Sequence, residues 1–384
     1  MPWLPQWRVT VGDDVYTTVT SVSYATGRLD IDRQATAGYC QVQIVNADNS
    51  AFTINITEPI TLELKNSAGV YKQVFAGTVS DFNIGVRSPD ETGFVTTGTI
   101  LGIGPLSKLT KAVYNTAIAS ARDGEQIAVI LDAALAGTWD EVNATVTWAT
   151  YPATVTWNQA ENSLGQIDQG EFDMIQINAS ASAKSQTLVD QIANSGLGII
   201  SEGPDGLVYY ADADHRENYL LANGYTALNA DYATPSSIQS QTQTARLRNS
   251  LIYKYSTGYA TLLTLTDTAS IASYGLFEKS TESNILNTTD MQQIAVRELD
   301  LRRDPRGSLG AIRFRLDNPQ LPSAILDDLI TVFCNEPVSI NNLPSNLLGG
   351  TFTGFVENIA VNATPTYVDM TLYVSATDFS IPPI

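Results

Sequence analysis

The chain has 384 residues, more than one hydrophobic core usually serves, and its 43% hydrophobic content is enough for two or more domains. Its 40 acidic and 21 basic residues give a net charge of −19, which argues against a protein that grips the phosphates of nucleic acid but not against one that DNA slides past. The start lacks the pattern of a secretory signal peptide and no apolar helical run could span a bilayer, so we expect synthesis in a cytoplasm and no membrane segment.

Short alternating strands are predicted from Arg8 to Ile103. Runs such as WRVTV, CQVQIVN and ITLEL are separated by the turn residues of GDD, ADNS and KNSAG. Regular short strands with such turns indicate an antiparallel barrel or sandwich. Gly104 and Pro105 end this pattern, and we place a first domain at residues 1–105.

The apolar period then changes to that of a helix. Asp123 and Gln126 form a plausible capping box, and Gly137 is placed to end the helix that they start. A second helix is predicted over Ser185–Ser195. The runs LGIIS, EGPDG and LVYYA then indicate strand, turn and strand, so residues 106–240 are predicted to form a smaller mixed region.

Strands return after Arg248 in SLIYKYS and ATLLTLT. A third helix is predicted over Asp290–Arg303, where Thr289 and Gln292 supply a capping box. The end of the chain alternates again as strands do, and we place the third domain at residues 241–384.

One strand-like phrase occurs twice, as FAGTVSDF near the start and FTGFVENI near the end. The repeated residues are Phe75, Gly77, Val79, Asp81, Phe352, Gly354, Val356 and Asn358. Upstream of each phrase stands a similar apolar run, Ile60 to Leu62 in one case and Ile330 to Val332 in the other. Two strand phrases therefore recur in the same order.

The apolar alternation changes parity within both copies of the phrase. Because successive side chains point to opposite faces of a strand, such a change requires an extra residue, and we expect a β-bulge just after Asp81 and just after Asn358. Two interpretations stay open: two unrelated strands that share a bulge, or two copies of one β-domain. With a duplicated domain, three chains around an axis would present six similar domains to a six-fold partner.

The chain resembles the tail hub proteins of tailed phages, which are called minor tail proteins in long-tailed phages, and more distantly the central hub of contractile baseplates. The resemblance rests on VTVGDDVYTTVTSVSYATGR, on FAGTVSDF, on the helix that leads into GLGIISEGPDGLVYYADAD, and above all on SIASYGLFEKSTESNILNTTDMQQIAVREL. In the last of these a strand around Tyr274 and Gly275 is expected to lead through a polar turn into the third helix.

This resemblance implies a mainly β fold with an α+β insert, in which two similar tube-like β-barrel domains accompany the smaller mixed region. It implies a homotrimeric ring at the virion tail tip, made in the cytoplasm of the host bacterium. A distal tail or tail tube protein would lie above the ring and a tip, spike or fibre protein below it. DNA would pass through the lumen during ejection without specific binding. No catalytic residues and no cofactor come with the family core.

Catalytic and metal signatures are sparse. His215 is the only histidine, and in the polar run HRENY we interpret it as a solvated side chain. Cys40 and Cys334 lack zinc spacing and are expected to be buried small hydrophobes. The acids of ADADHRE lack the spacing of an EF-hand loop and are interpreted as solvated acids at a strand end. We therefore assign no catalytic, cofactor-binding or metal residue.

Arg302, Arg303 and Arg306 form the densest positive cluster. As the end of a helix they need no further role, because basic side chains are favourable there. On an acidic subunit they are also candidates for salt bridges between subunits. Both interpretations stay open.

Two other functions compete with a non-enzymatic tail hub. An acidic β-rich chain with 17 Tyr and 5 Trp offers aromatic platforms for a carbohydrate-binding or receptor-binding tail module. A cell-envelope hydrolase is the other alternative, because two carboxylates for glycoside cleavage can meet from anywhere in a fold.

Overall fold

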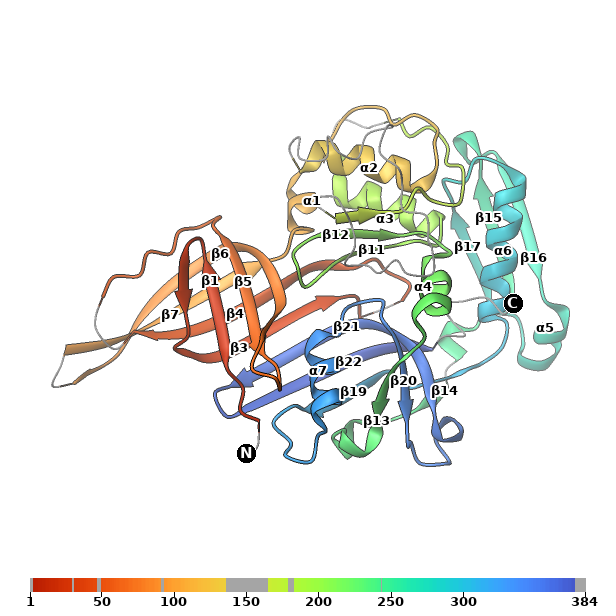
Figure 1. Cartoon of the computed structure of the whole chain (residues 1–384). Coiled ribbons are helices and arrows are strands. Elements are labelled where there is room, and N and C mark those ends of the chain that lie inside the picture. Colours follow the sequence, from red (N-terminus) through yellow and green to blue (C-terminus); the bar gives the residue numbers. More distant parts are fainter. Residues whose placement is uncertain are drawn as a thin grey trace.

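The computed structural model of the chain describes residues 3–29, 31–46, 50–90, 93–135, 165–178, 183–242 and 244–376. The fold is mainly β, as the sequence predicts. The two ends of the chain supply β-rich units that lie side by side, and a mixed unit lies above them in Figure 1. A further module of strands and one long helix lies beside the mixed unit.

The N-terminal unit is built from strands with alternating burial. In the first strand, for example, Trp7, Val9 and Val11 are buried and the two residues between them are half-buried. The strands are β1 (Trp7–Val11), β2 (Asp14–Tyr16), β3 (Val19–Gly27), β4 (Thr36–Asn46), β5 (Pro59–Lys65), β6 (Tyr71–Asp90) and β7 (Gly93–Ile103). Strands β6 and β7 extend beyond the others as an arm (Figure 1).

The C-terminal unit continues the same sheet. Its elements are β13 (Thr226–Asn229), β19 (Ala311–Arg315), α7 (Ser323–Thr331), β20 (Pro337–Asn341), β21 (Phe352–Thr364) and β22 (Tyr367–Ala376). Strand β21 pairs with β3 of the N-terminal unit, so the described strands of both units form one 12-stranded sheet. The prediction of two barrel domains is corrected here, because the described strands pair as one open, continuous sheet and not as two closed ones.

The mixed unit agrees with the predicted order of elements. It contains α1 (Ser107–Lys111), β8 (Val113–Tyr114), α2 (Asp123–Ala134), β9 (Gly165–Ile167), β10 (Ala183–Lys184), α3 (Ser185–Ser195), β11 (Ile199–Glu202), β12 (Val208–Ala211) and α4 (His215–Asn223). The bounds of α3 are those predicted, and its buried face includes Leu188, Val189 and Ile192. Strands β11 and β12 pair as the predicted antiparallel hairpin.

The predicted capping box of α2 is wrong by one residue. The N-cap is Arg122, whose backbone N–H donates to the Glu125 side chain. Asp123 is instead buried, and its carboxylate accepts hydrogen bonds from the Tyr210 hydroxyl and the Phe172 backbone N–H. Gly137, the predicted end of the helix, lies outside the described residues.

The strand and helix module contains β15 (Ser250–Tyr255), β16 (Thr261–Thr266), α5 (Thr268–Tyr274), β17 (Glu278–Glu282) and α6 (Thr288–Arg302), and the short strands β14 (Gln241–Thr242) and β18 (Gly307–Ser308) flank it. The N-cap of α6 is Asn287 and not Thr289, because the Asn287 side chain accepts from the Asp290 backbone N–H. The strand expected around Tyr274 is also wrong: Tyr274 ends α5, and Gly275 follows it with φ +88°.

Two large hydrophobic cores organise these elements. One joins the strands of both β-rich units with helix α7. The other joins the mixed unit with β15 and α6, so residues from 251 to 299 pack with the mixed unit.

Cys40 and Cys334 are buried and unpaired, as predicted. The division at residues 105 and 240 stays a prediction. Within the described residues, no helix is both long and apolar enough to cross a membrane.

Candidate functional site

The repeated phrase lies in strands β6 and β21, and both copies have the same register against their neighbours. Gly77 lies opposite Ile60 of β5, and Gly354 lies opposite Val338 of β20. Two residues earlier, Phe75 lies opposite Leu62 and Phe352 lies opposite Ile340. The true counterpart of the run Ile60 to Leu62 is therefore in β20.

The upstream match with Ile330 to Val332 is wrong. Ile330 and Thr331 are the last residues of helix α7, and Val332 follows them. The similarity arose because Ile330, near the end of α7, and Val332, just after it, are both buried and stand two positions apart, as apolar residues on one face of a strand do.

Both strands carry a β-bulge at the same place in the phrase. Against β7 the register shifts between Val79 and Asp81, so Ser80 is the extra residue. Against β22 it shifts between Val356 and Asn358, so Glu357 is the extra residue. The expected position, after Asp81 and Asn358, is corrected: the extra residue comes directly before them. Alternation alone could not decide this, because both residues between the two apolar runs are polar in each copy.

A fourth strand extends the correspondence. Phe82 lies opposite Ile100 of β7, which lies opposite Val42 of β4. In the other unit Ile359 lies opposite Leu372 of β22, which lies opposite Ile312 of β19. Strands β4, β5, β6 and β7 therefore occupy the same relative places as β19, β20, β21 and β22. The eight repeat residues occupy matching positions in these two four-strand sets.

The two bulges differ in what their extra residue does. Ser80 is half-buried, and its hydroxyl donates to the Leu101 carbonyl on the neighbouring strand at 3.2 Å. Glu357 is buried, and its side chain reaches the place where both β-rich units and helix α4 meet. The bulge of the C-terminal unit thus delivers a charged group to the junction of three parts of the molecule.

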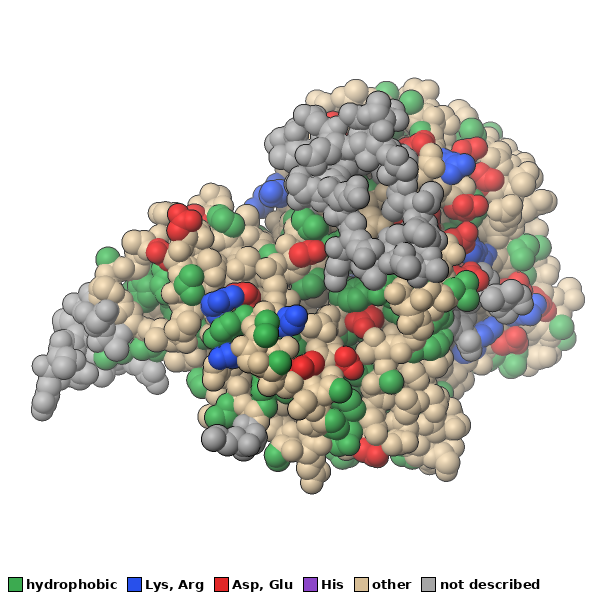
Figure 2. All heavy atoms as spheres, viewed as in Figure 1, with side chains coloured by type: hydrophobic (Ala, Val, Ile, Leu, Met, Phe, Trp, Pro, Cys, Tyr) green, Lys and Arg blue, Asp and Glu red, His purple; other side chains and the backbone are tan. Residues whose placement is uncertain are grey.

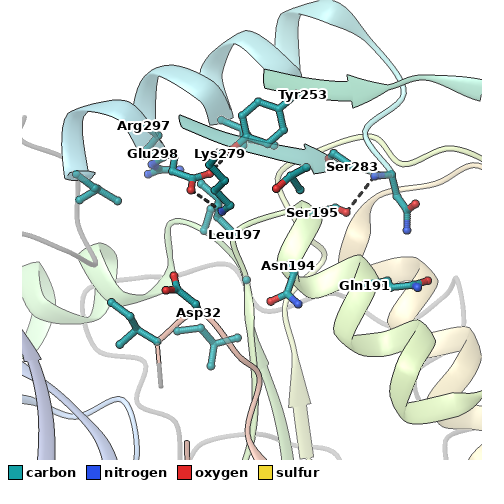
Figure 3. A pocket seen from close by; sticks show the side chains of 18 of the residues that line it. Asp32, Gln191, Asn194, Ser195, Leu197, Tyr253, Lys279, Ser283, Arg297 and Glu298 are labelled. Atoms are coloured by element: carbon teal, nitrogen blue, oxygen red, sulfur yellow. Dashed lines mark hydrogen bonds and ion pairs between the residues drawn. The ribbon is translucent and has the colours of Figure 1, made fainter. Parts of the chain in front are cut away.

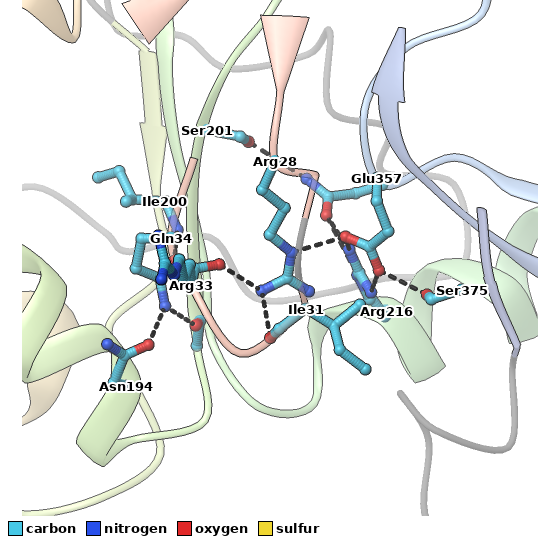
Figure 4. A network of polar contacts seen from close by, with 12 residues as sticks. Arg28, Ile31, Arg33, Gln34, Asn194, Ile200, Ser201, Arg216, Glu357 and Ser375 are labelled. Carbon is cyan, nitrogen blue, oxygen red and sulfur yellow. Dashed lines mark hydrogen bonds and ion pairs between the residues drawn. The ribbon is translucent and has the colours of Figure 1, made fainter. Parts of the chain in front are cut away.

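Glu357 connects these parts through two arginines (Figure 4). Arg28, just after β3, donates from Nε to one carboxylate oxygen at 2.7 Å. Arg216, in the first turn of α4, donates to both oxygens at 2.8 and 2.9 Å, and its Nε donates to Asn335 Oδ1 at 3.1 Å. The Ser375 hydroxyl of β22 also donates to Glu357. We call Arg28, Arg216 and Glu357 the junction triad.

Burial and charge act in opposite directions on the junction triad. Burial favours the neutral form of Glu357, but the positive charges of Arg216 and Arg28 outweigh it and hold the Glu357 pKa well below its usual range. Burial lowers the pKa of Arg216, and Glu357 opposes that change. One carboxylate therefore accepts hydrogen bonds from two guanidinium groups and carries the only negative charge of the triad. Sequence analysis missed this triad; the available signal was a charged residue within a strand whose other residues are uncharged.

A cavity of about 590 Å³ opens beside the junction triad, between the N-terminal unit, the mixed unit and the strand and helix module. Figure 3 shows Asn194 of α3, Tyr253 of β15 and Asp32 facing this space. Two pairs of its charged groups bind each other: Lys279 Nζ lies 2.6 Å from a Glu298 oxygen, and Arg302 Nη2 lies 2.9 Å from an Asp32 oxygen. The described residues hold no group of three or more His, Cys, Asp or Glu side chains placed to bind a metal ion.

The prediction that His215 is solvated is wrong. His215 begins α4 and is 2% exposed, and its Nδ1 lies 2.8 Å from an oxygen of buried Asp168. Burial lowers the His215 pKa to about 3 and raises that of Asp168 well above its usual range. The polar run around His215 misled the prediction because its neighbours also bind one another: Asp212 accepts the backbone N–H groups of Asp214 and His215.

Several carboxyl groups of the mixed unit and its borders are buried or half-buried, and within the described residues they form no ion pair with Lys or Arg. Burial raises the pKa values of Asp123, Glu202, Asp212 and Glu336 to about 7. Such groups ionise near pH 4 in an unfolded chain, so between about pH 4 and pH 7 these four carboxyl groups bind more protons in the folded chain, which outweighs the opposite effect of the single His215. Stability is therefore expected to fall as pH rises through this interval.

Glu202→Gln tests this pH dependence. The Glu202 carboxyl belongs to β11 and accepts backbone N–H groups from Gly38 and Leu106, so it ties the mixed unit to the N-terminal unit. Each such group contributes a slope of up to about 1.4 kcal/mol per pH unit. Because glutamine resembles the protonated acid, the variant is expected to lose less stability than the wild type between pH 5 and pH 8. Urea unfolding across this range measures it, and parallel profiles would contradict the assignment.

The basic cluster forms ion pairs within the chain. Arg302 Nη2 lies 2.9 Å from Asp32 on the N-terminal unit, and Arg303 lies 3.1 Å from Asp300 one helical turn earlier. Arg306 donates to the Asp300 carbonyl oxygen. These contacts suit the end of α6. Over the face shown in Figure 2, acidic and basic side chains are interspersed among uncharged ones.

Comparison with protein-family models and with curated protein sequences gives no match. Solved structures do match. The 43 kDa tail protein of prophage MuSo2 from Shewanella oneidensis is 14% identical, with a TM-score of 0.59, and the match covers 98% of this chain and 100% of that one. The tail protein from Neisseria meningitidis MC58 is 12% identical, with a TM-score of 0.61, and the match covers 99% and 100%. Over its full length, this chain has the fold of phage and prophage tail proteins.

Proposed function

We propose that this chain is a structural tail hub of a bacteriophage. Three copies form a ring at the distal end of the tail tube, where they join the tube or its adaptor ring to tip, spike or fibre proteins. The fold shared with two phage or prophage tail proteins supports a place in the tail. The sequence identity to those proteins is low, so the shared fold alone does not carry the hub role. That role rests on the duplicated strand unit.

The observation that carries the proposal is the matching register of the two four-strand sets. Two copies of one unit in each of three chains give six similar units, so a trimer can meet a six-fold tube. The two units of one chain are already joined edge to edge through β3 and β21, which is the arrangement that neighbouring units of a ring require.

The charge of −19 fits a ring that DNA crosses without binding. A channel wall that repels phosphates does not bind the DNA. A basic wall would bind it, because contacts with the phosphates release counterions. A channel lined by Arg and Lys would contradict this part of the proposal. The role is non-enzymatic: we expect no turnover of purified cell wall.

Electron cryomicroscopy of purified tails tests the proposed position and symmetry. We expect three copies of this chain at the distal end, arranged as six similar lobes around the tail axis. Copies that decorate the outside of the tail as fibres would contradict the hub and favour the receptor-binding alternative. Release of cell-wall fragments by the purified chain, abolished by one Asp or Glu substitution, would favour the hydrolase.

A further inference from the structure

The distal half of β6 has one paired edge, whereas its counterpart in β21 has two. Strand β5 pairs with β6 only as far as Thr78, while β7 stays paired with it to Asp90. No other described strand pairs with β6 beyond that point. In β21 the matching residues, from Asn358 to Ala363, pair with β22 on one edge and with β3 on the other. The free edge of β6 is thus the equivalent of an occupied edge.

The side chains on this half of β6 are also more exposed than their counterparts in β21. Ile84 and Val86 are 58% and 65% exposed. Their register equivalents, Val361 and Ala363, are 1% and 4% exposed. Phe52 packs against Phe82 at the start of this half, but beyond it strand β6 keeps the apolar alternation of a covered strand while Ile84 and Val86 stay exposed. Natural sheets usually protect a free edge with charged residues, and from 81 to 86 only Asp81 is charged.

The second unit contains a segment placed as β3 is in the first. Strand β3 runs antiparallel beside β4, whose counterpart is β19. Beside β19, Ala233 bridges Phe314, and the Thr234 N–H donates to the Arg313 carbonyl oxygen at 2.7 Å. Further along, β14 pairs antiparallel with β18, just before β19. Residues 233–242 therefore lie along β18 and β19, with the 3₁₀ turn Pro235–Ser237 between the two contacts, at the place that β3 takes beside β4; we call them the edge segment.

The edge segment has the properties of a strand donor. It contains no charged residue, so it can approach another backbone without repulsion. Its strand β14 pairs only with β18 among the described elements. In Figure 1, β14 lies at the opposite end of the molecule from the β6 and β7 arm. The free edge and the edge segment of one chain therefore cannot meet each other, but those of neighbouring chains can meet head to tail.

We propose that in the assembled ring the edge segment of one copy of this chain pairs with the free edge of β6, from Asp81 to Val86, on the next copy. The contact repeats between chains the junction that β3 and β21 make within a chain. It rests on the proposed function, since it assumes three copies in a closed ring. Backbone pairing supplies the affinity, and covering Ile84 and Val86 supplies apolar burial.

The double variant Ile84→Lys and Val86→Lys tests the surface. Both side chains are exposed in one copy, so the fold is expected to survive, and circular dichroism and melting of the monomer check it. Lysines on an edge strand oppose pairing. Native mass spectrometry is expected to show three copies for the wild type and loss of that species for the double variant. Leu262→Lys is the matched control: Leu262 is 62% exposed on β16, another edge strand, and this variant is expected to keep three copies.

Disulfide formation tests whether the edge segment is the segment that pairs with the free edge of β6. Asn83 and Gln239 are exposed and lie within the two proposed edges. A mixture of an Asn83→Cys chain and a Gln239→Cys chain is expected to form a covalent pair under mild oxidation, and neither chain alone should do so. A chain with both substitutions is expected to give a covalent trimer, because the proposed head-to-tail contact closes a ring of three copies. The native Cys40 and Cys334 do not interfere: both are buried, and burial raises the pKa of each to about 12.

The outcomes separate this inference from the proposed function. If the wild type forms three copies but the double lysine variant does so equally and no disulfide forms, the hub stands and this contact is wrong. Covalent products that stop at two chains in the doubly substituted protein would also overturn it, since they indicate a two-fold contact. If the wild type has no three-copy state, alone or in purified tails, the proposed function itself fails.

Discussion

Glu357→Gln is expected to lower the free energy of unfolding by about 3–5 kcal/mol, the usual cost of removing one partner from a buried ion pair. The substitution keeps the size of the side chain but leaves Arg28 and Arg216 facing each other without a carboxylate. Both arginines are nearly inaccessible to water, with 9% and 4% of their side chains exposed. Urea unfolding at neutral pH measures the loss.

Two further variants show whether charge is the cause. Arg216→Met leaves Arg28 and Glu357 as a neutral pair, so it should cost less than Glu357→Gln, although it also removes the bond to Asn335. Glu282→Gln removes an acid that is 59% exposed and 3.8 Å from Lys254, and a change below about 1 kcal/mol is expected. If Arg216→Met cost as much as Glu357→Gln, packing and not charge would be responsible.

The stability difference between the wild type and Glu357→Gln is expected to disappear at low pH. The folded-state pKa of Glu357 lies below its unfolded value, so its stabilisation is present above about pH 4 and is lost as pH falls toward the folded pKa. The unfolding free energies of wild type and variant are therefore expected to converge in acid. A constant difference down to the acid unfolding transition would contradict an ionised Glu357.

Local patterns predicted elements well but their starting residues less well. Helix α3 was found because its apolar residues recur at helical spacing and Gly196 follows it. The cap of α6 was misplaced because several residues with capping chemistry stand next to one another there, and the cap of α2 because a tertiary contact occupies the residue with capping chemistry. Asp123 was taken for a cap, for example, but its carboxylate is bound to Tyr210, which is 87 positions away.

The junction triad and the joined sheet could not be predicted, because both depend on contacts between the ends of the chain. Arg28 and Glu357 are 329 positions apart, and β3 meets β21 across a similar span. Alternation gives the face of a strand but not the identity of its neighbour. The repeated phrase was informative because a duplicated register leaves the same letters in both copies, and Glu357 escaped notice because its counterpart, Ser80, is uncharged.

Gly77→Ala and Gly354→Ala are expected to destabilise the chain by similar amounts, about 2–3 kcal/mol each, as overpacking within a sheet does. A Cβ at Gly77 would overlap the Ile103 carbonyl oxygen of β7, and a Cβ at Gly354 would overlap the Ser375 carbonyl oxygen of β22. Both obstacles are backbone atoms, so the strands would have to separate. Thermal and urea unfolding measure the change.

Gly85→Ala is the matched control on the same strand β6, beyond the bulge. The nearest atom to its Cβ would be the Thr97 hydroxyl at 3.2 Å, which can rotate away. Replacing glycine where space allows usually stabilises slightly, because the unfolded chain loses freedom. We therefore expect a neutral or slightly positive change at Gly85 and a loss at the two repeat glycines. If Gly77 tolerated alanine and Gly354 did not, the shared register would not reflect shared packing, and the argument for six similar units in a ring would lose its strongest support.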